Sequence, residues 1–155
     1  MIRAVVFDLD GTLANTAELK NGRREPYDVL KLSPPGASTV ELRFGDGREW
    51  LPGYLASNGY RVGIVTNSPP AYASTLLDLL LVDFERLLAG SKIYESKAKK
   101  LVALSDDWGI ATDAILYVGD LPEDQVAAKM SGCGFLRSSK INLLKYPCFT
   151  TWLIF

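Results

Sequence analysis

The sequence contains no histidine. This absence excludes Ser-His-Asp and Cys-His catalysis from the chain, together with every metal site that histidine would hold. A catalytic group in this sequence must therefore be a carboxylate, a lysine, a hydroxyl group or a backbone group. Aspartate is the first candidate among them.

Cysteine is scarce, since Cys133 and Cys148 are the two occurrences in 155 residues. Such a low number excludes a disulfide framework and a cysteine-rich zinc site. We interpret both side chains as reduced, packed thiols, which are typical of a cytoplasmic protein.

An excess of charge of one sign and long apolar runs are missing as well. The formal net charge is −1, whereas binding to nucleic acid or to an anionic membrane favours a basic patch. No apolar run reaches the ~18 residues of a membrane span, and the first residues lack the pattern of a signal peptide. We therefore expect a soluble, cytoplasmic protein with no nucleic-acid partner and no membrane partner.

The composition is that of a globular domain with a sizeable core. Hydrophobic residues make up 48% of the chain and charged residues 23%. No repeat, low-complexity tract or linker divides the sequence, and its length suits one domain. We expect a single domain that comprises residues 1–155.

Apolar runs and amphipathic helical patterns alternate along this domain. We expect strands at 2–7, 61–65, 86–89, 115–118 and 135–137. We expect helices at 48–58, 71–81, 96–108 and 124–131. Strands that alternate with helices are typical of a parallel sheet with helices on its faces. The sequence therefore predicts an α/β fold with a mainly parallel sheet of about five strands.

Two aspartates, Asp8 and Asp10, stand at the carboxyl end of the first expected strand. Charges at the end of a buried strand are costly unless a metal, a cation or a substrate uses them. In open α/β sheets, ligands bind in the crevice beyond the carboxyl ends of the strands. We therefore expect Asp8 and Asp10 to lie where the chemistry takes place.

Polar residues follow three further strands in the same way. Thr66 and Asn67 come after the second strand, Lys97 opens the helix after the third, and Asp120 follows the fourth, with Asp124 one helical turn later. Parallel strands deliver these side chains to one edge of the sheet. We expect them to form one site with the two aspartates.

Three of these residues also have a purely structural interpretation. Thr66 suits a helix-capping hydroxyl, and Asp124 suits the negative charge that the first turn of a helix favours. Lys97 lies in a basic run, which is usually a solvated face. The other lysines of this run are Lys92, Lys99 and Lys100.

The four polar junctions resemble the motifs of the haloacid dehalogenase-like (HAD) phosphohydrolases. Asp8-Leu9-Asp10-Gly11-Thr12 is similar to the first motif, Thr66 to the second, Lys97 to the third, and Gly119-Asp120-Leu121-Pro122-Glu123-Asp124 to the fourth. The resemblance extends from Val5 to about Phe135. It implies a Rossmann-like, three-layer α/β/α domain.

The resemblance also implies a division of roles. Asp8 would be the nucleophile that forms an aspartyl-phosphate, and Asp10 the general acid and then base. Thr66, the backbone N–H of Asn67 and Lys97 would hold the phosphate. Mg²⁺ would be held by the Asp8 side chain, the Asp10 carbonyl and Asp120, with Asp124 ligating through water or holding Lys97.

The expected function is therefore Mg²⁺-dependent hydrolysis of a phosphate monoester. The insert at 14–45 is too short for a large helical cap, and we expect a flap, with strands at 27–32 and 40–44. In this short insert, and in Tyr94-Glu95-Ser96-Lys97, the chain is similar to the magnesium-dependent phosphatase-1 group. An open site of this kind would admit a phosphorylated small molecule or a phosphoprotein.

The segment 138–155 ends in a strongly apolar tail. It could add an edge strand, pack on a helix or form a homodimer contact. The sequence leaves these three alternatives open.

Other functions remain as alternatives to hydrolysis. A phosphotransferase or mutase would need a cap or an acceptor site that excludes water, and the short insert counts against it. Dehalogenation is a weaker alternative, because an acid at Asp10 and a set of metal-binding carboxylates favour a phosphate substrate. A non-catalytic binding protein could share the fold, although the retention of every motif residue argues against it.

Overall fold

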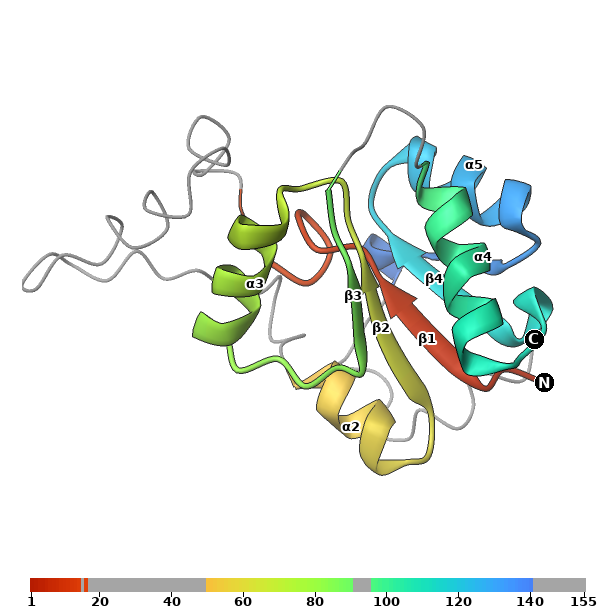
Figure 1. Ribbon diagram of the computed structural model, residues 1–155, viewed down its shortest axis with the longest axis horizontal. Helices are drawn as coiled ribbons and strands as arrows, with labels where there is room; N and C mark the ends of the chain where they lie inside the picture. Colours follow the sequence, from red (N-terminus) through yellow and green to blue (C-terminus); the bar gives the residue numbers. More distant parts are fainter. Residues whose placement is uncertain (15, 17–49, 91–95, 141–155) are drawn as a thin grey trace, which may run out of the picture.

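The structure is a computed structural model that describes residues 1–14, 16, 50–90 and 96–140 (Figure 1). The expected flap hairpin at 27–32 and 40–44 and the apolar tail after residue 140 lie outside the described residues. The same is true of Cys148, of Lys92 and of the Tyr94-Glu95 pair.

The chain forms a five-stranded sheet in the order β3-β2-β1-β4-β5, and every neighbouring pair is parallel. The strands are β1 (Ala4–Phe7), β2 (Arg61–Val65), β3 (Arg86–Leu88), β4 (Ile115–Gly119) and β5 (Gly134–Arg137). This is the Rossmann-like α/β fold that the sequence predicts. The first strand lies in the middle of the sheet, so the residues that follow it emerge at the centre of one edge.

Helices cover both faces of this sheet (Figure 1). They are α2 (Leu51–Ser57), α3 (Pro70–Leu79), α4 (Lys97–Trp108) and α5 (Pro122–Ser131), with short 3₁₀ helices η3 (Thr112–Ala114) and η4 (Ser138–Lys140). In Figure 1, α2 and α3 lie on one side of the sheet, and α4 and α5 lie on the other. None of the helices within the described ranges has the length and apolar character needed to cross a bilayer.

The alternation of side chains along β1 divides the apolar core into two clusters. Val5 and Phe7 pack into the cluster that contains α2 and α3, whereas Ala4 and Val6 pack into the cluster that contains α4 and α5. All four are at most 3% exposed. A strand buried on both faces is typical of a parallel sheet, and its apolar sequence follows from this position.

The strand register sets the carboxyl ends of three strands level with one another. Phe7 pairs with Ile64 of β2 on one side and with Val118 of β4 on the other. The backbone N–H of Asp8 continues the pairing, since it donates to the Val118 carbonyl at 2.8 Å. The residues that follow β1, β2 and β4 therefore meet at the same edge.

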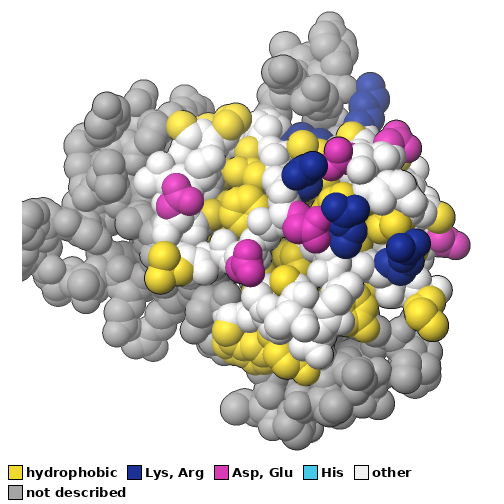
Figure 2. Space-filling view, turned by 60° about the horizontal axis from the view of Figure 1, so that its bottom comes forward, with side chains coloured by type: hydrophobic (Ala, Val, Ile, Leu, Met, Phe, Trp, Pro, Cys, Tyr) yellow, Lys and Arg dark blue, Asp and Glu magenta, His cyan; other side chains and the backbone are white. Residues whose placement is uncertain are grey.

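The described surface carries both signs of charge. On the face shown in Figure 2, the Lys and Arg side chains are interspersed with Asp and Glu rather than gathered in a patch of one sign. This distribution agrees with the small net charge of the whole sequence.

Candidate active site

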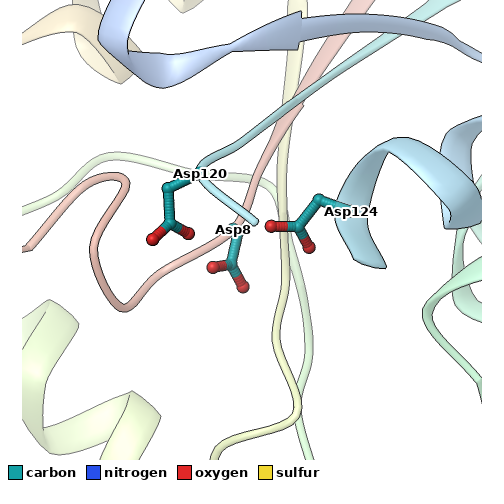
Figure 3. Close-up of side chains that lie close together, drawn as sticks. All are labelled: Asp8, Asp120 and Asp124. Atoms are coloured by element: carbon teal, nitrogen blue, oxygen red, sulfur yellow. The ribbon is translucent and has the colours of Figure 1, made fainter. Parts of the chain in front are cut away.

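Three carboxylates meet at the edge where β1 and β4 end. Asp8, Asp120 and Asp124 each offer an oxygen, and these atoms all lie within 4.8 Å of one another (Figure 3). Asp8 follows β1, Asp120 follows β4, and Asp124 lies in the first turn of α5. We call this group the carboxylate cluster.

Two glycines allow the backbone to pass close to the carboxylate cluster. A Cβ at Gly119 would lie 2.5 Å from Asp124 Cβ, and a Cβ at Gly11 would collide with the Asp120 carboxylate. Gly11 also has φ +79°, a conformation that glycine adopts without strain. Both positions therefore require glycine for the carboxylates to come together.

Lys97 lies inside this cluster. Its Nζ donates to Asp8 Oδ1 at 2.8 Å and to Asp124 Oδ1 at 2.6 Å, and its side chain is 11% exposed. Its position follows from the start of α4, where the Ser96 hydroxyl accepts from the Lys99 N–H as an N-cap. Lys97 is therefore not a solvated surface lysine, whereas Lys99, two residues later, is exposed.

Asp124 both caps a helix and contacts Lys97. Its Oδ2 accepts from the backbone N–H of Leu121 at 3.0 Å, which caps the start of α5. Its Oδ1 accepts from Lys97 and from the Tyr117 hydroxyl, the latter at 3.1 Å. A fully buried carboxylate with this many donors is fixed in one orientation.

Burial raises the pKa of Asp8 to about 7, although Lys97 lowers it through its charge and its hydrogen bond. The pKa of Asp120 is also raised, first by burial. For Lys97, burial acts against the charged form, but Asp8 and Asp124 outweigh it and the pKa is raised. One ammonium group therefore compensates only part of the negative charge of the cluster.

The donor set of the cluster fits a hard divalent cation. All its side-chain ligands are carboxylate oxygens. Mg²⁺ and Ca²⁺ prefer oxygen ligands, whereas softer metals prefer nitrogen or sulfur. The negative charge of Asp124 is one of the causes that raise the pKa of Asp8. A cation bound between the two carboxylates would offset this repulsion. The residues present therefore fit the metal that the sequence implies.

Asp10 faces the same cavity but lies outside the carboxylate cluster, and hydroxyl groups surround it. Its Oδ1 accepts from Thr16 at 2.6 Å and from Tyr72 at 2.9 Å, and its Oδ2 accepts from Ser68. Ser68 and Tyr72 come from the turn after β2 and the start of α3, and Thr16 from the segment that follows β1.

The cavity between these groups has a volume of about 330 Å³. It is lined by Asp8, Asp10, Thr66, Asn67, Ser68, Pro69, Lys97 and Leu121. The structure thus brings five predicted site residues to one hollow, and the other two, Asp120 and Asp124, to the cluster beside it. A tetrahedral anion of the size of phosphate fits a cavity of this volume.

The junction after β2 is held by a second lysine. Lys100, buried on α4, donates through Nζ to the carbonyls of Thr66, at 2.8 Å, and of Gly90, and to Asn67 Oδ1 at 3.2 Å. The Thr66 hydroxyl accepts from the Ser68 N–H at 3.1 Å, a local bond like that of a capping residue. The side chain of Thr66 therefore shapes the turn as well as lining the cavity.

Sequence reasoning missed several residues that contact the site. Thr12 donates to Asp120 Oδ1 at 3.3 Å, and Ser68 donates to Asp10. Thr12 stands inside the first motif and Ser68 two residues after Thr66, so the neighbouring motif residues could have indicated both. Tyr72, Tyr117 and Lys100 carry no such signal, because they lie on apolar or basic stretches whose pattern indicates only helix or strand.

A parallel α/β sheet with this cluster at its carboxyl edge has the fold of haloacid dehalogenase-like structures. CbbY from Rhodobacter sphaeroides, solved in complex with phosphate, superposes with a TM-score of 0.65 at 18% identity, over 88% of this chain and 86% of that one. A haloacid dehalogenase-like family hydrolase, SP0104 from Streptococcus pneumoniae, gives 0.63 at 19% identity, over 88% and 84%. At these identities the likeness shows the fold.

Among curated proteins, the chain is similar to phosphoglycolate phosphatases. The Escherichia coli (strain K12) protein is 33% identical over 85 residues, which are 52% of this chain and 34% of that protein. The Rhodospirillum rubrum protein is 38% identical over 86 residues, which are 53% and 36%. The match thus spans about a third of the length of these relatives.

No family model matches the chain. The sequence relatives and the shared fold support the expected assignment to the HAD superfamily. They do not show the narrower resemblance to the magnesium-dependent phosphatase-1 group.

Proposed function

We propose that this protein is a HAD-type phosphatase that hydrolyses a phosphate monoester through an aspartyl-phosphate on Asp8. One observation carries the proposal: Lys97 bonds Asp8 and Asp124 within the carboxylate cluster, beside a cavity that Asp10 and Thr66 also line. The similarity to phosphoglycolate phosphatases supports the same reaction.

In the first step, a carboxylate oxygen of Asp8 attacks phosphorus and the bond from phosphorus to the ester oxygen breaks. Asp10 gives its proton to the departing oxygen, which leaves as an alcohol. In the second step, water attacks the aspartyl-phosphate, Asp10 takes a proton from it, and inorganic phosphate and Asp8 are released. Two moderate barriers replace one high barrier.

The residues around the cavity supply the charges and donors that the transferred phosphoryl group needs. Lys97 would offset the negative charge on its oxygens, and Thr66 and the N–H of Asn67 would donate to them. Lys100 supports this arrangement, because it fixes the Thr66 carbonyl and the Asn67 amide in place.

Mg²⁺ would be held by Asp8, the Asp10 carbonyl, Asp120 and Asp124. When bound, the cation supplies the positive charge that offsets the repulsion between the phosphate and the carboxylates. Asp124 at the same time keeps Lys97 in place, because Asp124 Oδ1 accepts a hydrogen bond from Lys97 Nζ at 2.6 Å.

The substrate class is also part of the proposal. The relatives are named for a small phosphorylated acid, which favours a small molecule. The similarity to the cap-poor magnesium-dependent phosphatase-1 group would instead admit a phosphoprotein side chain.

The direct test is hydrolysis of a panel of phosphate monoesters that includes phosphoglycolate, para-nitrophenyl phosphate and a phosphopeptide. We expect phosphate release with Mg²⁺, loss of activity with a chelator, and loss of activity in Asp8→Asn. Asp113→Asn, which changes an exposed aspartate of η3, is the matched control and should keep full activity. A protein that binds Mg²⁺ but hydrolyses none of the panel would contradict the proposal and favour a non-catalytic role.

A further inference from the structure

The hydroxyl of Tyr72 reaches the site from inside the apolar core. Tyr72 lies in the first turns of α3, and its side chain is fully buried in the cluster that packs α3 on the sheet. Its Oη donates to Asp10 Oδ1 at 2.9 Å. The ring thus belongs to the core, and the polar tip belongs to the cavity.

Packing alone does not explain a tyrosine at this position. A phenylalanine would fill the same apolar space, whereas a buried hydroxyl is costly unless it has a partner. Here the partner is the carboxylate that the proposed reaction uses as acid and base. The contact therefore links the rigid core to the group that moves a proton.

Among the described residues, two more side chains donate to Asp10, and they are anchored differently. Ser68, half-buried, belongs to the turn after β2, and Thr16 belongs to the segment that follows β1. Both reach Asp10 through short side chains, so their positions depend on their own loops. Tyr72 alone among these three donors is carried by a helix and held by a packed ring.

We propose that Tyr72 is a positioning residue, which holds the Asp10 carboxyl in the orientation that proton transfer to the leaving group requires. This inference rests on the proposed phosphatase function. Proton transfer depends on donor and acceptor geometry, and a displacement of about 1 Å can reduce a rate by roughly a hundred-fold.

The effect should depend on the leaving group. An alkoxide is a poor leaving group and needs the proton of Asp10 as the ester bond breaks. Nitrophenolate leaves readily without a proton. A displaced Asp10 should therefore slow the cleavage of an alkyl phosphate far more than that of an aryl phosphate.

The test compares kcat/KM for two probes, phosphoglycolate and para-nitrophenyl phosphate, in wild type and Tyr72→Phe with Mg²⁺. This ratio reports the steps up to departure of the leaving group, so later hydrolysis of the aspartyl-phosphate does not enter. We expect a loss of about ten-fold or more for phosphoglycolate and of less than about three-fold for the aryl phosphate. If the wild type does not use phosphoglycolate, the best alkyl phosphate of the panel takes its place.

Tyr60→Phe is the matched control. Tyr60 packs against the same apolar cluster, and the same hydroxyl deletion there should leave both values unchanged. Equal losses for the two probes in Tyr72→Phe would show a merely structural role and overturn the inference, as would no loss. A wild type that hydrolyses neither probe nor the rest of the panel would overturn the proposed function itself.

Discussion

The side chain of Asp8 combines burial with an incomplete set of counter-charges. This side chain is 5% exposed, and burial raises its pKa to about 7 although Lys97 Nζ lies 2.8 Å from Asp8 Oδ1. From its residue type alone, Asp8 is expected to be ionised at neutral pH. In the folded chain, burial shifts this pKa upward and so favours the protonated form more than for an exposed aspartate.

This property predicts a pH-dependent stability for the metal-free protein. Below about pH 4, Asp8 is protonated in both folded and unfolded chains. As the pH rises toward 7, the unfolded chain loses this proton first, so stability falls, by on the order of 4 kcal/mol for a shift of about three pKa units. Urea unfolding in chelator between pH 4.5 and 8 (roughly the range of this shift) measures it.

Asp8→Asn isolates the contribution of this one group, because other carboxylates titrate in both proteins. The variant should gain stability relative to wild type as the pH rises, and saturating Mg²⁺ should reverse the difference at pH 8 (about one unit above the raised pKa). A pH-independent difference between the two proteins would contradict the raised pKa of Asp8.

The sequence predicts the charged residues of the site better than the residues that support them. Asp8 and Asp120 could be assigned because charged side chains at strand ends need a partner, and Lys97 because of its place at the start of a helix and its spacing to Asp120. Tyr72 and Lys100 could not, because a tyrosine on an apolar helical face and a lysine in a basic run have ordinary explanations. Only tertiary packing brings their polar tips to Asp10 and to Thr66.

Among the elements, β2 and α4 approach each other closely at a glycine of the strand, Gly63. A Cβ at Gly63 would lie 2.8 Å from Trp108 Cη2 and 3.3 Å from Leu104 Cδ1. Because α4 also carries Lys97 and Lys100, this contact fixes the height of both lysines along the sheet. Gly63 therefore allows α4 to pack closely on β2, and α4 in turn positions the two lysines.

We predict that Gly63→Ala destabilises the protein by about 1–3 kcal/mol, since an added methyl group must displace the Trp108 ring. Gly53→Ala is the matched control. Gly53 lies in α2, and an added Cβ there would meet Asp83 Cβ at an ordinary contact distance of 3.8 Å. This control substitution should stabilise the protein by about 0.5–1 kcal/mol. Chemical denaturation of both variants checks the pair, and equal effects would contradict the close-contact account.

Element type follows from the sequence more reliably than element bounds. The strands match the expected ranges closely because their apolar runs end at polar or glycine residues. The helix α5 begins at Pro122 rather than at Asp124, since proline suits the first turn of a helix. The strand order, with β1 in the middle, depends on long-range pairing that the local pattern does not contain.

At the scale of the whole molecule, metal binding should be linked to global stability. The carboxylate cluster joins β1, β4 and α5, so a cation bound there ties the centre of the sheet to a helix that covers it. A ligand that binds only the folded state at a hundred-fold excess over its Kd adds about 2.7 kcal/mol.

We therefore predict a rise in Tm when Mg²⁺ is added to the metal-free protein. Asp120→Asn should lose most of this rise, because it removes one carboxylate of the cluster, while Asp113→Asn should keep it. Thermal unfolding at several Mg²⁺ concentrations gives the comparison. An unchanged rise in Asp120→Asn would contradict the placement of the metal.

The proposed reaction requires a covalent phosphoenzyme on Asp8, which mass spectrometry of the acid-quenched protein detects. Asp10→Asn should form the intermediate from para-nitrophenyl phosphate, whose leaving group needs no proton, and hydrolyse it slowly. After reaction with this substrate and Mg²⁺, we expect one phosphate on the peptide that contains Asp8. Nitrophenolate released in a burst with no phosphate on that peptide would contradict the proposed reaction.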